Sequence, residues 1–285
     1  MRHTRVAILL AALAASGGLM LRGSRWHAIS TRWVDQGLMT QARRGACSVL
    51  LTDGRVVITG GSDGSRPLAT AEIFDGSGAF AETAPMSAAR TGHVCAALPD
   101  GHVLVAGGAS FGGGVINSSE IYDPAADAWS PAGPMMEART GATASTGPDG
   151  RILVAGGDTG SAASSTLEIY DPAAGTFSTV PGALSSPRMN HAAAVLKDGR
   201  VLIAGGTNGS VALDTVDVFD SSSNSVTQTL KMSSPRAGLS ATRLLDGTVL
   251  FAGGTDGSAD LATAELFDPK TSAFSAAPPM KTPLC

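Results

Sequence analysis

Two sets of charged residues recur at one constant interval along the chain. The basic set consists of Arg43, Arg90, Arg139, Arg188 and Arg236. The acidic set consists of Glu72, Glu120, Glu168, Asp217 and Glu265. A guanidinium tolerates burial when a carboxylate bonds it in a bidentate manner. Because each base is followed by one acid, we expect structural ion pairs, either within one repeat or between neighbouring repeats. The alternative is a ring of arginines that binds anions at one end of a channel.

The charged residues belong to a longer repeat. A Gly-Gly doublet ends an apolar run five times, at intervals of 47 to 49 residues. The doublets are Gly60, Gly61, Gly107, Gly108, Gly156, Gly157, Gly205, Gly206, Gly253 and Gly254. Self-similarity at such a period indicates a repeat architecture.

Each period predicts four antiparallel strands. An Asp-Gly pair precedes every apolar run, and this pair favours a tight hairpin turn. The first strand follows the arginine, the second ends at Gly-Gly, the third carries the carboxylate, and the fourth carries Trp, Phe or Val. A four-stranded meander of this size is one blade of a β-propeller. We therefore predict an all-β fold with complete blades over residues 42–86, 89–135, 138–184, 187–232 and 235–280.

One repeat shows a known motif intact. Gly107-Gly108, Tyr122 and Trp129 together resemble the kelch motif. The Met-x-x-x-Arg segments, with a histidine three residues after two of the arginines, resemble the variant of that family found in exported bacterial proteins, and the chain is also similar to the central propeller of galactose oxidase. The resemblance implies a kelch-type β-propeller over residues 28–285. It does not specify a function, because one fold serves many.

The N-terminal end of the repeat region leaves the number of blades open. Trp33 and Met39 match Trp129 and Met135, so residues 28–38 predict a fourth strand without its three partners. The first hypothesis is an incomplete propeller whose parent has six or more blades. The alternative is a five-bladed ring with a redundant N-terminal strand.

Residues for metal or redox chemistry are few. The resemblance to galactose oxidase implies a copper site with a Tyr cross-linked to Cys, a second Tyr and two His. Tyr122 and Tyr170 occupy a position that is Phe in the other repeats, and His93 and His191 lie two repeats apart. No close cluster of His, Cys and carboxylates follows from the spacing, so we predict no metal and no cofactor.

Three cysteines, Cys47, Cys95 and Cys285, leave at least one thiol unpaired. Cys47 and Cys95 lie one register apart in successive repeats. Neighbouring residues on a strand point to opposite faces, so we predict no bridge between them and expect small buried side chains.

The first 22 residues differ from the rest. Arg2 and Arg5 precede an apolar run over residues 6–15, which is typical of a secretory signal peptide, the alternative being an uncleaved membrane anchor. We therefore expect a secreted, periplasmic or cell-surface protein that contacts a membrane only through such an anchor. The net charge of −4 gives no case for nucleic acid as a partner.

The loops between second and third strands are longer and more variable than the tight turns at the opposite edge. They share one face with the connections from each fourth strand to the next blade, and variable loops on a rigid scaffold are where binding usually lies. Candidate binding residues are Asp63, Arg66, Phe111, Asn117, Asp158, Asn208, Asp214, Asp256 and Asp260. We expect a protein or carbohydrate partner at this face.

Taken together, these patterns favour a non-catalytic binding scaffold over an enzyme. No nucleophile elbow, phosphate-binding loop or dinucleotide fingerprint occurs in the sequence. The alternative is a sugar-active enzyme that resembles the sialic acid mutarotases or a carbohydrate oxidase, because mutarotation needs little more than an acid–base pair.

Overall fold

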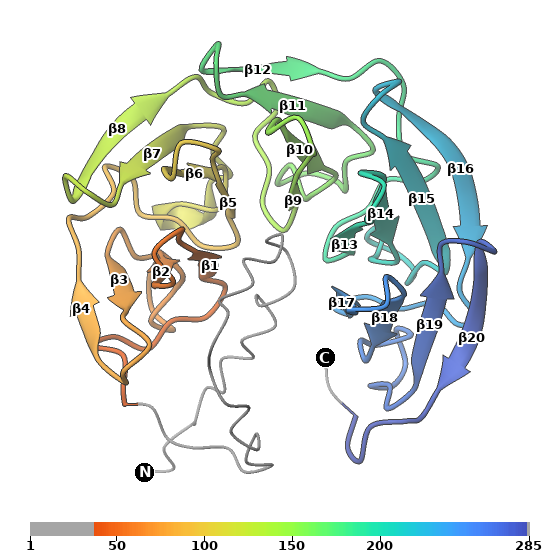
Figure 1. Ribbon diagram of the computed structural model, residues 1–285. Helices are drawn as coiled ribbons and strands as arrows, with labels where there is room; N and C mark the ends of the chain where they lie inside the picture. The colour runs from red at the N-terminus through yellow and green to blue at the C-terminus, as the bar shows by residue number, and fades with distance from the viewer. Residues whose placement is uncertain (1–36, 284–285) are drawn as a thin grey trace, which may run out of the picture.

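The computed structural model describes residues 37–283, and short antiparallel strands form almost all of its regular structure. Twenty strands make five four-stranded sheets in which every strand pairs with its sequence neighbours. The sheets stand around a common axis with their first strands innermost (Figure 1). This arrangement is a β-propeller, and the predicted all-β blades are confirmed.

The strands of each blade are given from the innermost outward. Blade 1 holds β1 (Cys47–Leu50), β2 (Val56–Thr59), β3 (Ala71–Phe74) and β4 (Phe80–Glu82). Blade 2 holds β5 (Val94–Ala97), β6 (Val103–Ala106), β7 (Ser119–Asp123) and β8 (Ala128–Ala132). Blade 3 holds β9 (Thr143–Thr146), β10 (Ile152–Ala155), β11 (Leu167–Asp171) and β12 (Thr176–Thr179). Blade 4 holds β13 (Ala192–Val195), β14 (Val201–Ala204), β15 (Thr215–Asp220) and β16 (Ser225–Lys231), and blade 5 holds β17 (Ser240–Arg243), β18 (Val249–Ala252), β19 (Ala264–Asp268) and β20 (Ala273–Ala277).

One short 3-10 helix, η2 (Phe111–Gly113), lies in the loop between β6 and β7. Among the described residues, no helix is long and apolar enough to span a membrane. The predicted signal segment and most of the predicted extra strand over residues 28–38 lie outside the described residues. Gly37 and Leu38, the two residues of that strand that are described, are not in a strand.

The hydrophobic core lies between blades. Each of the four contacts between consecutive blades in residues 37–283 buries one cluster of apolar side chains. Between blades 1 and 2, for example, Val57 and Ile73 meet Val105 and Tyr122. The second strand of blades 1 to 4 is buried at every position, because both of its faces are covered.

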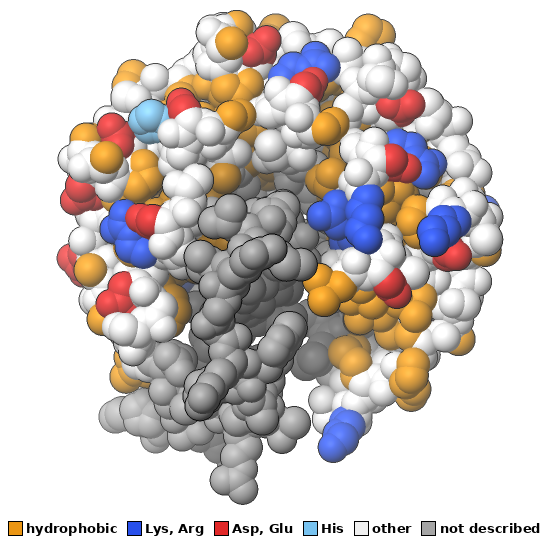
Figure 2. Space-filling view, in the orientation of Figure 1, with side chains coloured by type: hydrophobic (Ala, Val, Ile, Leu, Met, Phe, Trp, Pro, Cys, Tyr) orange, Lys and Arg blue, Asp and Glu red, His pale blue; other side chains and the backbone are white. Residues whose placement is uncertain are grey.

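Blade 5 differs in one respect. Every second residue of β18 is only partly buried, namely Leu250 and Ala252. These side chains lie on the face turned away from blade 4, where no further sheet is present among the described residues. Hydrophobic side chains gather over β17 and β18 in Figure 2.

The prediction that Cys47 and Cys95 form no bridge is wrong. They form a disulfide between β1 and β5, with Cα atoms 6.0 Å apart. The two residues do point to opposite faces of their own sheets. In a ring of blades, however, the face of one sheet that looks forward packs against the backward face of the next, so residues on opposite faces meet. The one-register offset is therefore what a bridge between neighbouring blades requires.

Two tyrosines at equivalent places differ in their hydrogen bonds. Tyr122 and Tyr170 are both fully buried, as expected at a position that is Phe in the other repeats. The Tyr122 hydroxyl donates to Asp127 Oδ1 at 2.8 Å, whereas the Tyr170 hydroxyl has no hydrogen-bond partner among residues 37–283. Gly175 stands where Asp127 stands in blade 2, and both have positive φ. Blade 3 therefore lacks the acceptor that its tyrosine would use.

The disulfide leads to the first prediction. Replacing Cys47 and Cys95 together by Ser should lower the free energy of unfolding by about 2–4 kcal/mol, because the bridge closes a long loop in the unfolded chain. Urea unfolding followed by tryptophan fluorescence measures this. Reduced wild-type protein should match the double variant, and equal stability of oxidised wild type and variant would contradict the prediction.

The tyrosines give a matched pair of substitutions. Tyr122→Phe should lower the free energy of unfolding by about 1 kcal/mol, because it removes a buried hydrogen bond. Tyr170→Phe should leave stability unchanged or raise it, since the lost hydroxyl has no partner among the described residues. Thermal unfolding of the two variants side by side tests this, and equal losses would show the reasoning to be wrong.

Candidate functional site

Each repeating arginine ties together three segments of its own blade. In blade 3, Arg139 Nη1 donates to the carbonyl of Gly156 at 2.6 Å and to that of Thr166 at 3.3 Å. Its Nη2 donates to Thr166 Oγ1 at 2.8 Å and to Glu168 Oε1 at 2.6 Å. The arginine thus joins the Gly-Gly doublet, the end of the loop between β10 and β11, and the carboxylate on β11.

The carboxylate extends this contact to the preceding blade. Glu168 accepts backbone N–H groups of Met136 at 2.7 Å and Glu137 at 3.1 Å, which lie on the connection arriving from blade 2. Equivalent ion pairs occur in all five blades, with N–O distances of 2.6–3.1 Å: Arg43–Glu72, Arg90–Glu120, Arg139–Glu168, Arg188–Asp217 and Arg236–Glu265. The paired side chains are at most 4% exposed, so these guanidinium groups are not presented to a ligand.

The electrostatics of blade 2 show what holds such a pair in its charged form. Burial acts to raise the pKa of Glu120, but hydrogen bonds from Ser87 and the charge of Arg90 outweigh it and keep the pKa below its ordinary value. Burial also lowers the pKa of Arg90, and Glu120 opposes that shift. The pair is therefore ionised and mutually dependent.

Two histidines lie beside these pairs between blades. Burial, together with the charge of Arg90, lowers the pKa of His93 to about 3, and the same causes with Arg188 lower that of His191 to about 3. Their Nε2 atoms lie 2.8 Å from Thr59 Oγ1 and 2.9 Å from Thr143 Oγ1. Both rings are neutral near pH 7 and pack between blades.

Three of the predicted binding residues cap their own loops. The side-chain Oδ1 atoms of Asp63, Asn208 and Asp256 each accept two backbone N–H groups, two and three residues further on, at 2.7–2.9 Å. Asp158 Oδ1 accepts the N–H of Gly160 at 2.9 Å. These hydrogen bonds stabilise the hairpin turns, and Asp63, Asn208 and Asp256 are exposed.

The other predicted residues have individual surroundings. Asp214 pairs with Lys231 at 3.3 Å, Arg66 lies 3.7 Å from Asp63, and Asn117 donates to the Met135 carbonyl at 2.9 Å. Phe111, in η2, is 79% exposed. Asp260 is exposed and bridges Thr255 through its backbone. The candidates are thus spread over the loops of all five blades.

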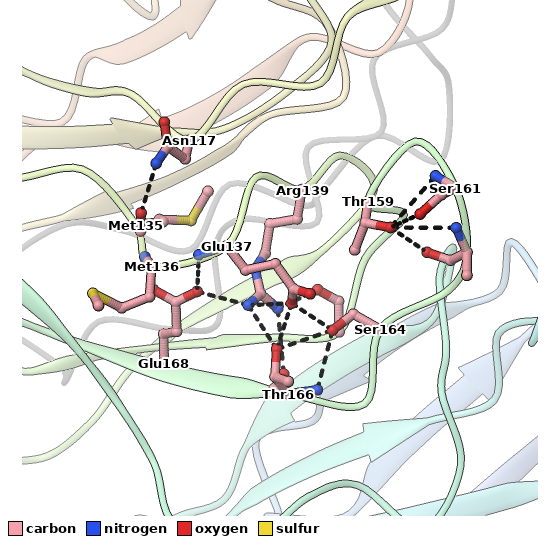
Figure 3. A network of polar contacts seen from close by, with 12 residues as sticks. Asn117, Met135, Met136, Glu137, Arg139, Thr159, Ser161, Ser164, Thr166 and Glu168 are labelled. Atoms are coloured by element: carbon pink, nitrogen blue, oxygen red, sulfur yellow. Dashed lines mark hydrogen bonds and ion pairs between the residues drawn. The ribbon is translucent and has the colours of Figure 1, made fainter.

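Blade 3 carries a polar network that the sequence reasoning missed (Figure 3). Glu137 Oε2 accepts hydrogen bonds from Ser164 at 2.7 Å, Thr166 at 2.6 Å and Arg139 at 3.0 Å. In each blade, one residue of the loop between the second and third strands donates its N–H to the carbonyl of the second glycine of the doublet. In blade 3 this residue is Ser164, and in the other four blades it is aliphatic. The aliphatic residues are Leu68, Ile116, Leu213 and Leu261. Comparison of the repeats at this position would have revealed the exception.

Glu137 is the accessible member of this network. Its side chain is 36% exposed and lies beside Met136, which is 66% exposed. Burial acts to raise its pKa, but hydrogen bonds from Thr166 and Ser164 and the charge of Arg139 leave the pKa below its usual value. Glu137 therefore offers a charged acceptor on the loop face, suited to a hydroxyl or ammonium donor.

A chain of backbone hydrogen bonds links the blades near the axis on the same face. In blades 2 to 5, the residue two positions after the arginine donates its backbone N–H to the carbonyl of the equivalent residue in the preceding blade, at 2.8–3.2 Å. The equivalent residues are Gly45, Gly92, Gly141, Asn190 and Gly238, all with positive φ. In the described blades Asn190 is the one member of this set with a side chain.

The repeats now identify the family. Residues 92–285 match the KLHDC2/KLHL20/DRC7 Kelch-repeats domain, and residues 43–79 match the Kelch motif. The chain belongs to the kelch-repeat family. No curated protein matches it.

Two solved structures share the kelch propeller fold. A fungal alcohol oxidase of the AA5 family, in complex with copper, aligns with a TM-score of 0.70 and 22% identity over 86% of this chain. The kelch chain spans 55% of that oxidase. The structure of YjhT aligns with a TM-score of 0.71 and 16% identity, over 86% of both chains. At these identities the likeness shows the fold alone.

Copper, which the alcohol oxidase holds, does not fit the described residues of this kelch chain. Among residues 37–283, no group of three or more His, Cys, Asp and Glu side chains is placed to hold a metal ion. Tyr122 and Tyr170 are buried between blades, and Cys47 and Cys95 are bonded to each other. The resemblance to galactose oxidase therefore extends to the propeller and not to a copper site in this part of the chain.

The network of blade 3 leads to a testable coupling. Ser164→Leu alone should destabilise the protein, because it sets an apolar side chain against the Glu137 carboxylate. Adding Glu137→Ser reproduces the pattern of blade 4, where Ser186 and Leu213 stand, and should recover about 1 kcal/mol or more. Urea unfolding of both single variants and the double variant measures this. Additive losses would contradict it.

Proposed function

We propose that this kelch protein is a non-catalytic binding scaffold whose partner, a glycan or a protein, binds the loop face. That face consists of the loops joining second to third strands and the connections from each fourth strand to the next blade. The observation that carries the proposal is the hydrogen bonding that fixes these loops. Their side chains cap their own turns, and backbone bridges such as Arg44–Ser62 and Thr140–Asp158 fasten them to the innermost segments.

The chemistry of the loop face favours a hydroxylated ligand. Sugars present hydroxyl donors, and Glu137 supplies a charged acceptor two residues after Met135, whose carbonyl accepts the amide of Asn117. Phe111 is an exposed aromatic ring in the loop of blade 2, suited to packing against a sugar ring. The loops are otherwise poor in the aromatic and arginine side chains that dominate protein–protein hot spots. A glycan is therefore the favoured partner, with a protein as the alternative.

Export is the second part of the proposal. A disulfide between β1 and β5 is typical of proteins in oxidising compartments and supports a secreted, periplasmic or cell-surface location. The segment expected to direct export lies in residues 1–22, outside the described residues. A sugar-active enzyme remains the rival function, supported by the shared fold with the alcohol oxidase and by the accessible Glu137 carboxylate.

A glycan array with the purified chain tests the proposal. A bound glycan should lose about tenfold or more in affinity on Phe111→Ala or Asn117→Ala, which corresponds to about 1.4 kcal/mol. Leu245→Ala is the matched control, because Leu245 is 95% exposed but lies in the turn between β17 and β18, at the opposite edge of the blade.

Saturation-transfer NMR of the sugars that bind separates the two functions. The scaffold proposal expects binding without chemical change. Anomer exchange or oxidation of a bound sugar that Glu137→Gln abolishes would establish the enzyme instead. Affinity lost equally in Leu245→Ala would contradict the assignment of the loop face.

A further inference from the structure

The outermost strand of blade 4 differs from those of the other described blades. β16 is seven residues long, whereas β4, β8, β12 and β20 have three to five residues. It stands at the end of its sheet, on the rim of the propeller (Figure 1). The outward N–H and C=O groups of such a strand are a template for pairing with another chain, unless proline, charge or a bulge blocks the edge.

Prolines interrupt or end the other four rim strands. Pro131 lies within β8, and Pro85, Pro181 and Pro278 follow the ends of β4, β12 and β20 by one to three positions. Proline cannot donate to a ladder, so it limits pairing at an edge. β16 contains no proline, and its single charge is on Lys231, the last residue. Among the blades of residues 37–283, blade 4 alone therefore has a long rim strand without a proline in it or directly after it.

A β-bulge affects the first half of β16. The pairing with β15 shifts between Val218 and Phe219. The bulge explains why Val226 packs between blades 3 and 4 while Leu230 packs between blades 4 and 5, since residues four apart on a regular strand would share one face. From Gln228 onward the register with β15 is regular. The second half of β16 is therefore the part that can accept a further strand.

The outward backbone groups of this half belong to Thr229 and Lys231. The N–H of Met232 donates to the Asp214 carbonyl at 2.8 Å. Hydrogen bonding alternates along an antiparallel strand, so the residues one and three positions before Met232 direct their N–H and C=O groups away from β15. Both residues have exposed side chains. The edge thus offers two donors and two acceptors to one further strand.

A second copy of β16 complements these groups. When two copies run antiparallel with a two-fold axis at Leu230, Thr229 of each lies opposite Lys231 of the other. Both of these residues have outward backbone groups, so each pair can exchange N–H and C=O hydrogen bonds. The two Leu230 side chains then meet on one face of the sheet. The two lysines are not opposite each other, and the pairing therefore avoids the repulsion of directly opposed like charges.

We propose that two copies of this chain pair antiparallel through β16, so that one sheet runs through the fourth blades of both. A two-fold contact that uses the same surface twice is the commonest kind in homo-oligomers. One strand edge is small for a permanent interface, so we expect reversible association at micromolar to millimolar protein. Antiparallel pairing reverses the propeller axis, and the two loop faces therefore point in opposite directions. The dimer does not depend on the proposed glycan binding, but it would make that binding bivalent.

Sedimentation equilibrium of the full chain, from micromolar to millimolar protein, tests the proposal. We expect a reversible equilibrium between monomer and dimer. Amide hydrogen exchange of Thr229 and Lys231, followed by NMR, should slow as the protein concentration rises. A monomer at every concentration, or a dimer in which the exchange of these two amides is independent of concentration, would overturn the proposal.

Charge variants test the register. Thr229→Lys should weaken the dimer about fivefold or more, because like charges then lie opposite each other at two symmetric positions. Adding Lys231→Glu should restore it, since each introduced lysine then lies opposite an introduced glutamate. Thr179→Lys is the matched control, because Thr179 is exposed in β12 and lies opposite Glu168 as Thr229 lies opposite Asp217. A dimer that Thr229→Lys leaves intact, that Thr179→Lys weakens equally, or that the double variant does not restore would contradict the proposed pairing.

Discussion

The buried arginine–carboxylate unit is the interaction on which the rest of this propeller depends. In every described blade it joins the Gly-Gly doublet, the end of the long loop, the third strand and the connection from the preceding strand. Taking two charges out of water is expensive, and a buried pair is tolerated when hydrogen bonds satisfy it. Here the partners are mostly backbone groups of segments that would otherwise be loose. Because these loop segments supply the hydrogen bonds that the buried pair requires, the pair fixes their positions on the loop face.

The first residue of the doublet is glycine because the backbone of the next blade leaves no space for a side chain. A Cβ on Gly60 would lie 2.5 Å from the Arg90 carbonyl of the next blade, and φ there is +55°. Each repeat thus brings its backbone against its neighbour while its aliphatic side chains fill the space between sheets. Rigid loops on one edge and tight turns on the other follow from the same packing, and exceptions to the repeat stand out against it. Blade 3 holds two of them: Ser164 with Glu137 at the loop face, and Gly147 at the opposite edge, where the other described blades have leucine.

Much of this was predictable from the sequence, because the repeats specify local structure several times over. Asp-Gly turns, apolar second strands, the pairing of arginines with acids and the buried tyrosines all follow from residue type and interval. The site was less predictable. Asp63, Asn208 and Asp256 look like free ligands in the sequence, but turns in loops of this kind need their oxygens as caps. Glu137 was overlooked because its importance depends on Ser164, a residue 27 positions away.

By itself, the sequence determined the repeat, the strands and the pairing of arginines with carboxylates, because these features recur in each period. The tertiary structure alone decided how one blade meets the next. The Cys47–Cys95 bridge forms because the forward face of blade 1 packs against the backward face of blade 2. The register of strands within one sheet does not show this packing. The small hollow between blades 3 and 4 likewise combines Gly147 of one blade with Val201 and Phe219 of the next. Contacts between repeats depend on the relative orientation of whole sheets, which the burial of apolar area between blades sets and the local pattern does not encode.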